Sequence, residues 1–152
     1  MNIMLRRMLL CIDGEEHTAK AVEYALQVSK ATGAELTVLH VIDGFLLEKR
    51  ISHEIYAVGR NEYRAYVREE LSKLADKCIK RFEERAEKAG VKFSTKLRSG
   101  HPVEEVLKEI AESSYDLVVM GDKADQGIWK LKSRNLPLKV FRKTKASVMV
   151  VR

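Results

Sequence analysis

The sequence predicts a single α/β domain with a five-stranded, mostly parallel open sheet and helices on both faces of the sheet. Three observations lead to this prediction. Short apolar segments alternate along the chain with longer segments of helical periodicity, as in successive strand–helix–strand units. Several of the apolar segments are unbroken, as is typical of strands buried on both faces of a parallel sheet. The 152 residues also suffice for one domain, residues 1–152, and are too few for two.

The first half of the chain alternates two predicted strands with two predicted helices. Met8–Ile12 and Leu36–Ile42 are the strands, because both are runs without a charged residue. Between them, apolar side chains three and four residues apart predict a helix over about His17–Thr32. A long helix is predicted after an irregular segment at 43–51, and it ends at Gly90 because glycine readily adopts the left-handed conformation of a helix terminus. The predicted apolar stripe of this long helix consists of Tyr63, Val67, Leu71, Leu74, Cys78, Ile79, Phe82 and Ala86.

The third predicted strand, at 91–98, differs from the first two because apolar and polar side chains alternate along it. Val91, Phe93 and Leu97 are apolar, whereas Lys96 and Arg98 belong to the polar set between and after them. Alternation indicates a strand with one face in solvent. We therefore expect this strand at or near an edge of the sheet, with its polar face exposed.

The second half of the chain continues the same alternation. Pro102 opens a helix at its first turn, where the missing N–H of proline costs nothing. A strand at 116–121, a short helix at 136–142 and a fifth strand at 147–151 follow. The predicted buried stripe of the helix that begins at Pro102 consists of Val103, Val106, Leu107, Ile110 and Ala111.

The net charge of +6 is unevenly distributed along the chain. The segment after Asp125 holds eight Lys or Arg residues and no acidic residue, so the preceding part of the chain carries a net charge of −2. Trp129 and Phe141 lie among these basic residues, a combination that also occurs on surfaces that bind phosphate backbones. An acidic protein or a free nucleotide would suit the segment equally well. Because no nucleic-acid-binding motif is present, we do not expect nucleic acid as the partner.

Several other function classes are not expected from the composition. The longest apolar run is far shorter than the roughly 20 residues of a membrane-spanning helix, so no membrane segment is predicted. Cys11 and Cys78 are isolated and are predicted as core residues of a protein from a reducing cytoplasm. No catalytic elbow and no Walker lysine is found, so neither a hydrolase nor an ATPase is predicted. No metal site is predicted, because the histidines lack ligand spacing: His17, His40, His53 and His101.

Ligands of open parallel sheets bind at the carboxyl ends of the strands, which directs attention to the residues there. These residues also belong to ordered motifs that resemble the universal stress protein family. The motifs are Leu-Leu-Cys-Ile-Asp-Gly at 9–14, Ala-Glu-Leu-Thr-Val-Leu-His-Val at 34–41, Gly100-x-Pro102, Asp-Leu-Val-Val-Met-Gly at 116–121 and Ala-Ser-Val-Met-Val-Val at 146–151. The resemblance implies a Rossmann-like fold of the adenine nucleotide alpha hydrolase-like type, a cytoplasmic location, a role in stress response and a homodimer.

Members of that family either bind ATP or do not, and the resemblance identifies the residues that bear on this. The binders carry Gly-x2-Gly-x9-Gly-Ser/Thr after the fourth strand, and only Gly121 matches one of these four positions. Ala124 adds a methyl group, and Arg134 either fills the phosphate space or pairs with the phosphate. Asn135 keeps a hydrogen-bonding side chain at the last position. The candidate residues for ATP or AMP are Ile12, Asp13, Val41, Met120, Gly121, Ala124, Arg134 and Asn135.

The fifth predicted strand is apolar on both sides although it lies next to the end of the sequence. An apolar strand at an open edge invites pairing with another chain. The resemblance implies that this strand pairs antiparallel with its symmetry mate, which makes Val148, Met149 and Val150 the expected dimer interface. The alternative is an inner strand that is already covered by helices.

Three functions remain open from the sequence. The leading one is a regulatory or interaction module of the stress response, a cytoplasmic homodimer with weak or lost nucleotide binding and a protein client. The second is a switch that binds ATP or AMP through a modified phosphate loop. The third is an enzyme that acts on a small molecule in the crevice at the strand ends.

Overall fold

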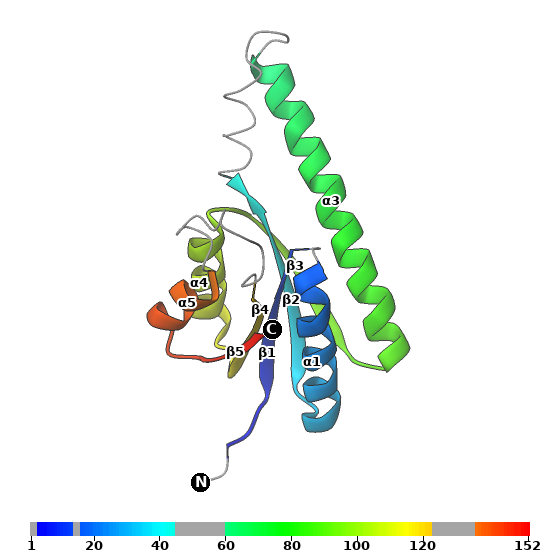
Figure 1. Ribbon diagram of the computed structural model, residues 1–152, viewed down its shortest axis with the longest axis vertical. Helices are drawn as coiled ribbons and strands as arrows, with labels where there is room; N and C mark the ends of the chain where they lie inside the picture. The colour runs from blue at the N-terminus through cyan, green and yellow to red at the C-terminus, as the bar shows by residue number, and fades with distance from the viewer. Residues whose placement is uncertain (1–2, 14–15, 45–59, 123–135) are drawn as a thin grey trace.

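The computed structural model describes residues 3–13, 16–44, 60–122 and 136–152, which form a five-stranded sheet with helices on both faces (Figure 1). The strand order is β3-β2-β1-β4-β5, and every neighbouring pair is parallel. The strands are β1 (Arg7–Ile12), β2 (Glu35–Asp43), β3 (Phe93–Gly100), β4 (Leu117–Gly121) and β5 (Ser147–Val151). The helices are α1 (Glu16–Thr32), α3 (Arg60–Ala89), α4 (Pro102–Ser113) and α5 (Leu136–Lys143). The predicted α/β class, the parallel sheet and the order of these elements are confirmed.

The sheet separates two hydrophobic cores because its central strands bury side chains on both faces. Met8 and Leu10 of β1 point into the core under α1 and α3, and Leu9 points into the core under α4 and α5. All three side chains are fully buried. Phe82 of α3 meets Phe93 of β3 edge to face in the first core, with ring centroids 5.3 Å apart. An unbroken apolar strand in the sequence therefore corresponds to a strand covered on both faces.

The strand order reverses between β1 and β4, and this reversal locates the ligand crevice expected of the fold. β1 pairs with β2 on one side, where Ile12 is level with His40. On its other side β1 pairs with β4, where Leu10 is level with Val119. The chain thus builds outward from β1 in both directions and leaves the carboxyl ends of β2, β1 and β4 side by side.

Glycines end two helices as expected from the sequence. Gly33 follows α1 with a φ of +74°, and Gly90 follows α3 with a φ of +69°. Both values lie in the left-handed region, which costs a residue with a side chain more than it costs glycine. The N–H of Gly33 donates to the carbonyl of Ser29 over 2.8 Å and closes the last turn of α1.

Two residues of the predicted helix stripes are placed differently by the structure. Leu74 of α3 is 57% exposed, and the core contact at this level is made by Ala75, which is fully buried. The small side chain of alanine lets the helix approach the core closely, and Leu74 lies on the flank. Ala111 of α4 is exposed, whereas Glu109 of the same helix is buried.

Over the described ranges, no helix combines the length and the apolar character needed to cross a membrane.

Candidate functional site

Five of the predicted nucleotide-binding residues lie together at the carboxyl edge of the sheet. Ile12 ends β1 and is buried, and Asp13 follows it at the surface. Gly121 ends β4, level with Ile12 by the register of the two strands, and the buried Met120 precedes it. Val41, one residue after His40, is half-buried on β2 at the level of Asp13. The other three predicted residues, Ala124, Arg134 and Asn135, lie outside the described residues.

His40 links two of the strands that form this crevice. The imidazole is buried, and its Nδ1 lies 3.0 Å from the carbonyl oxygen of Ile12. Because a carbonyl only accepts, Nδ1 carries the proton of this hydrogen bond. Burial lowers the pKa of His40, although the bond to Ile12 and the charge of Asp13 act in the opposite direction. The neutral ring therefore fixes the backbone immediately before Asp13.

The two cysteines are structural. Cys78 of α3 is buried in the first core, and Cys11 of β1 packs against the second. Burial raises the pKa of Cys11 to about 12 and that of Cys78 to about 11, so both thiols stay protonated and unreactive near neutral pH. Within the described ranges, no group of three or more His, Cys, Asp or Glu side chains is placed to hold a metal ion.

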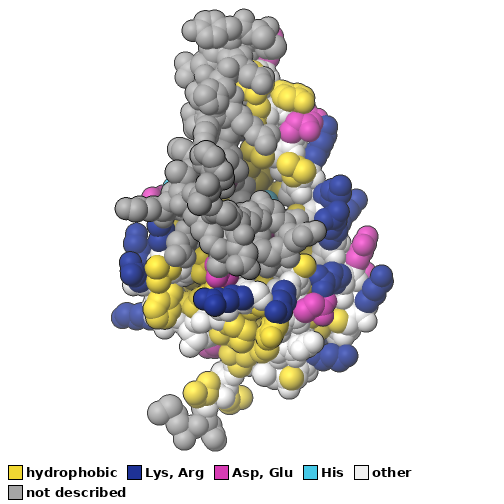
Figure 2. Space-filling model, viewed as in Figure 1, with side chains coloured by type: hydrophobic (Ala, Val, Ile, Leu, Met, Phe, Trp, Pro, Cys, Tyr) yellow, Lys and Arg dark blue, Asp and Glu magenta, His cyan; other side chains and the backbone are white. Residues whose placement is uncertain are grey.

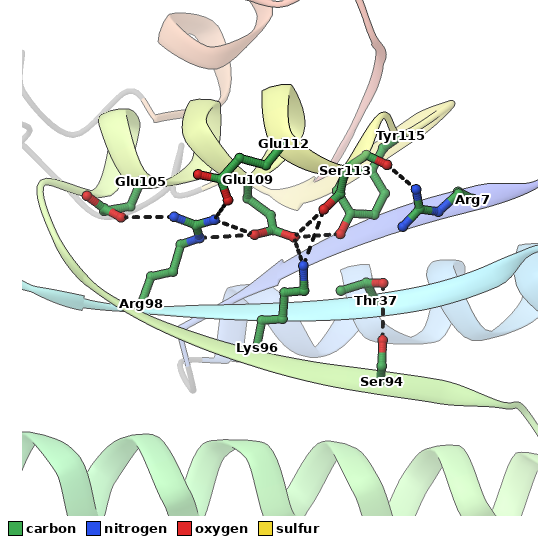
Figure 3. A network of polar contacts seen from close by, with 10 residues as sticks. All are labelled: Arg7, Thr37, Ser94, Lys96, Arg98, Glu105, Glu109, Glu112, Ser113 and Tyr115. Atoms are coloured by element: carbon green, nitrogen blue, oxygen red, sulfur yellow. Dashed lines mark hydrogen bonds and ion pairs between the residues drawn. The ribbon is translucent and has the colours of Figure 1, made fainter.

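A buried ionic network joins the edge strand β3 to α4 (Figure 3). The side chain of Glu109 is 0% exposed. Its Oε1 accepts hydrogen bonds from Lys96 Nζ over 2.6 Å and from Tyr115 Oη over 2.7 Å. Its Oε2 accepts two hydrogen bonds from Arg98, one from Nε over 3.0 Å and one from Nη2 over 2.8 Å. A buried carboxylate is tolerated only when it is paired in this way.

The charge state of Glu109 follows from these contacts. Burial alone raises the pKa of the carboxyl, but the hydrogen bonds from Lys96, Tyr115 and Arg98 outweigh burial and lower the pKa to about 2. Glu109 is thus ionised at any physiological pH. The network holds two cations of β3 under α4 and does not provide a titrating acid or base.

The network extends to the start of α4. Glu105 pairs with Arg98 over 3.4 Å and with Lys108 over 2.9 Å, and Glu112 also pairs with Arg98. Gly100, at the end of β3, has a φ of +150°, and a Cβ there would lie 2.9 Å from Oε1 of Glu105. These constraints account for the glycine of the Gly100-x-Pro102 motif.

The prediction for the third strand was thus right about its place and incomplete about its polar face. β3 is an edge strand of the sheet. Lys96 remains 43% exposed and Ser94 is exposed, as expected, but Arg98 is only 20% exposed, and both cations are bound to Glu109 of α4. Alternation shows that the two faces of a strand differ, but it does not show what covers the polar one. A glutamate between the apolar Val106 and Ile110 of a helix was the signal available in the sequence.

The opposite edge strand, β5, is apolar. Among the described strands it pairs with β4 alone. Met149 and Val151 face the first core and Val148 the second, while Val150 is 44% exposed. Helices therefore cover both faces of β5, and no described strand pairs with its outer edge, which agrees with the predicted edge position of this strand. The predicted interface residues Val148, Met149 and Val150 all lie on this edge strand.

Next to β5, α5 presents a surface that combines apolar and basic side chains. We call it the α5 surface: Leu138, Phe141, Arg142, Lys143 and Lys145, all of which are exposed. Figure 2 shows this side of the molecule, where hydrophobic side chains gather over α5 and β5 with Lys and Arg side chains around them. Phe141 is 59% exposed although it is a large aromatic residue. Exposed apolar area bordered by charge is typical of a contact surface.

Known proteins resemble this chain over its whole length. The model of the universal stress protein family matches residues 4–152. Universal stress protein YxiE of Bacillus subtilis is 27% identical over 150 residues, which cover 98% of this chain and 100% of that protein. The solved structure of universal stress protein UspA from Lactobacillus plantarum superposes with a TM-score of 0.78 and 15% identity, over 99% of this chain and 100% of that one.

A further solved structure shows the same fold. It is a universal stress protein from Archaeoglobus fulgidus in complex with dAMP, with a TM-score of 0.68, 13% identity and coverage of 99% of this chain and 100% of that one. At these identities the superpositions establish the architecture, and the family match over residues 4–152 establishes descent. The chain belongs to the universal stress protein family.

Proposed function

We propose that this chain is a regulatory or interaction module of the cytoplasmic stress response, active as a homodimer that pairs through β5, with weak or lost nucleotide binding. The observation that carries the proposal is the open, apolar outer edge of β5. Its Val150 is 44% exposed although it is a large apolar residue. An edge of this kind pairs readily with another strand, and a second copy of the same strand satisfies it by symmetry.

The geometry of the sheet supports antiparallel pairing of two copies. A two-fold axis perpendicular to the sheet brings β5 beside its own copy in antiparallel orientation and extends the sheet without exposing a new edge of β5. The same axis keeps each face of the sheet on its own side, so both copies of α5 lie on one face. Val148 packs under α5 in each copy, and the exposed Val150 then meets the partner strand.

Weak nucleotide binding follows from the sequence of the phosphate loop. Of the four positions in the binders' motif only Gly121 matches, and Arg134 stands where a glycine lets backbone N–H groups approach the phosphates. Arg134 adds a long side chain at that position. Asp13 and Val41 match the positions on the adenosine side of the site, whereas three of the four positions of the phosphate motif are changed.

A second candidate, a switch that binds ATP or AMP, is favoured by a separate observation. Ile12, Asp13, Val41 and Gly121 lie at one edge of the sheet, around the point where the strand order reverses. The Archaeoglobus fulgidus relative was solved in complex with dAMP, an adenine nucleotide with a single phosphate. In this version Arg134 and Asn135 form a modified clamp on the phosphate.

Two measurements test the proposal. Sedimentation equilibrium at micromolar concentrations is expected to give a particle of twice 17.4 kDa, and a 17.4 kDa particle under these conditions would rule out the dimer. Calorimetric titration with ATP and AMP, with and without Mg²⁺, is expected to give a Kd weaker than ~100 µM, which corresponds to about 5.5 kcal/mol. Tighter binding that Asp13→Ala abolishes would favour the nucleotide switch.

A further inference from the structure

The α5 surface gathers three exposed cations, Arg142, Lys143 and Lys145, close together in the sequence. Within the described ranges, Arg142, Lys143 and Lys145 form no ion pair. On the same face of the sheet, Lys96 and Arg98 are paired with carboxylates of α4. The last 27 residues of the chain contain no Asp or Glu, so none of them can neutralise these cations. The α5 surface therefore carries uncompensated positive charge.

The same surface offers apolar contact area. Phe141 and Arg142 are consecutive residues of α5, so this short helix presents an aromatic ring and a guanidinium on neighbouring parts of its outer surface. Both are exposed, while Val140 beside them is fully buried and anchors α5 to the second core. The buried Val140 thus keeps this part of α5 against the sheet, with Phe141 and Arg142 at the surface. Aromatic and arginine side chains of this kind dominate the binding energy of protein interfaces.

We propose that the α5 surface docks an acidic polypeptide segment that also carries an aromatic or aliphatic residue. Asp or Glu side chains of the segment would pair with Arg142, Lys143 and Lys145, and its apolar residue would pack on Phe141. This inference rests on the proposed function as an interaction module, and it specifies what kind of client that module binds. The dimer would present two such surfaces on one face of the extended sheet.

The surface fits a polypeptide better than a nucleic acid. Single-stranded nucleic acids are held by several aromatic side chains, on which successive bases stack. Among the described residues the α5 surface presents one aromatic ring, Phe141, and its other apolar contribution is the aliphatic Leu138. Aliphatic side chains bind other apolar side chains, so the chemistry favours a protein segment.

Selection from a random peptide library tests the proposal without a preconceived client. The library is displayed on phage and selected on the wild-type protein. We expect the enriched peptides to be acidic and to contain aromatic or aliphatic residues. Enrichment without an acidic bias would overturn the proposal.

Charge and packing are then tested separately with one enriched peptide and fluorescence anisotropy. The double variant Arg142→Glu/Lys143→Glu is expected to weaken binding at least ~tenfold, because it reverses the local charge. Phe141→Ser is expected to weaken binding at least ~threefold, because it removes the apolar contact. The matched control Lys77→Glu/Lys80→Glu makes the same change in net charge on exposed positions of α3 and is expected to leave binding unchanged. If the control and the test variants lose equal peptide affinity, the effect depends on net charge alone, and the proposal is overturned.

Two further readouts separate this inference from its alternatives. If a single-stranded oligonucleotide binds more tightly than the peptide and loses affinity in the α5 variants, the surface is a nucleic-acid site and the proposal fails. Sedimentation of the same proteins reports on the dimer independently. Peptide binding by a monomer would refute the dimer and support the client surface, whereas a dimer that binds no acidic peptide would refute the client surface alone.

Discussion

The two edges of the sheet, β3 and β5, expose the same kind of unpaired backbone but differ in side-chain chemistry. β3 carries Lys96 and Arg98, which are held under α4 by the buried Glu109. β5 carries valines and a methionine, and the cations of the neighbouring α5 surface have no partner in the described ranges. Charges on an edge strand are a common protection against unwanted pairing. The contrast supports the proposal that β5, and not β3, is the edge that pairs with a second copy.

The largest predicted effect concerns the protected edge. Glu109→Ala removes the buried carboxylate that binds both Lys96 and Arg98, leaves Lys96 without its carboxylate partner and takes away the acceptor of the Tyr115 hydroxyl. We expect the free energy of unfolding to fall by about 3 kcal/mol, because breaking a buried pair costs that much. Urea unfolding of the variant and the wild type measures this change in the free energy of unfolding. The control Glu104→Ala, at an exposed position of the same helix, is expected to change it by less than ~0.5 kcal/mol.

Acid should weaken the same edge by a somewhat smaller amount. The pKa of Glu109 is lowered from 4.5 to about 2 in the folded chain. A lowered pKa means that the stabilisation is fully present above the unfolded pKa and is lost as the pH falls through the folded value. Between pH 6 and pH 3 we expect Glu109 to account for a loss of about 2 kcal/mol. Urea unfolding of the wild type and of Glu109→Gln at both pH values isolates the contribution of Glu109 to this loss of unfolding free energy. Equal losses in the two proteins would contradict the prediction.

A smaller effect is expected at the end of β3. Gly100→Ala forces an alanine into a φ of +150° and brings its Cβ to 2.9 Å from the carboxylate of Glu105. We expect a loss of about 1–2 kcal/mol of unfolding free energy. A double-mutant cycle with Glu105→Ala separates the contact from the backbone strain. If the double variant is no more stable than additivity predicts, backbone strain alone accounts for the loss.

The sequence was sufficient for the elements of the fold and for the place of β3, whereas it left open whether β5 is an edge strand or an inner strand. Apolar runs and helical spacing report burial directly, so nearly all predicted boundaries agree with the structure within about two residues. Leu74 was predicted to lie on the buried face of α3, but Ala75 makes the core contact instead, because periodicity does not reveal which small residue allows the close approach. Local pattern thus predicts which segments are buried, and tertiary packing decides the individual contacts.

The polar contacts were much less predictable. Glu109 and Lys96 are 13 residues apart in sequence, and His40 and Ile12 are 28 apart. Neither pair has a spacing that marks it as a contact, because the register of the sheet and the packing of α4 bring the partners together. At the crevice, motif resemblance identified Ile12, Asp13, Val41, Met120 and Gly121, and the structure places these five at one edge. Their binding to a nucleotide stays a prediction.

The comparison of the edges is tested most directly by placing the same charge on each. Val150 of β5 and Leu97 of β3 are both 44% exposed, so Val150→Lys and Leu97→Lys are matched in exposure and in the charge they introduce. Sedimentation equilibrium of the two variants and the wild type measures the dimer dissociation constant. We predict that Val150→Lys weakens the dimer at least ~tenfold, because a lysine on an edge strand opposes pairing, and that Leu97→Lys leaves it unchanged. A dimer that survives Val150→Lys and is lost in Leu97→Lys would contradict the account.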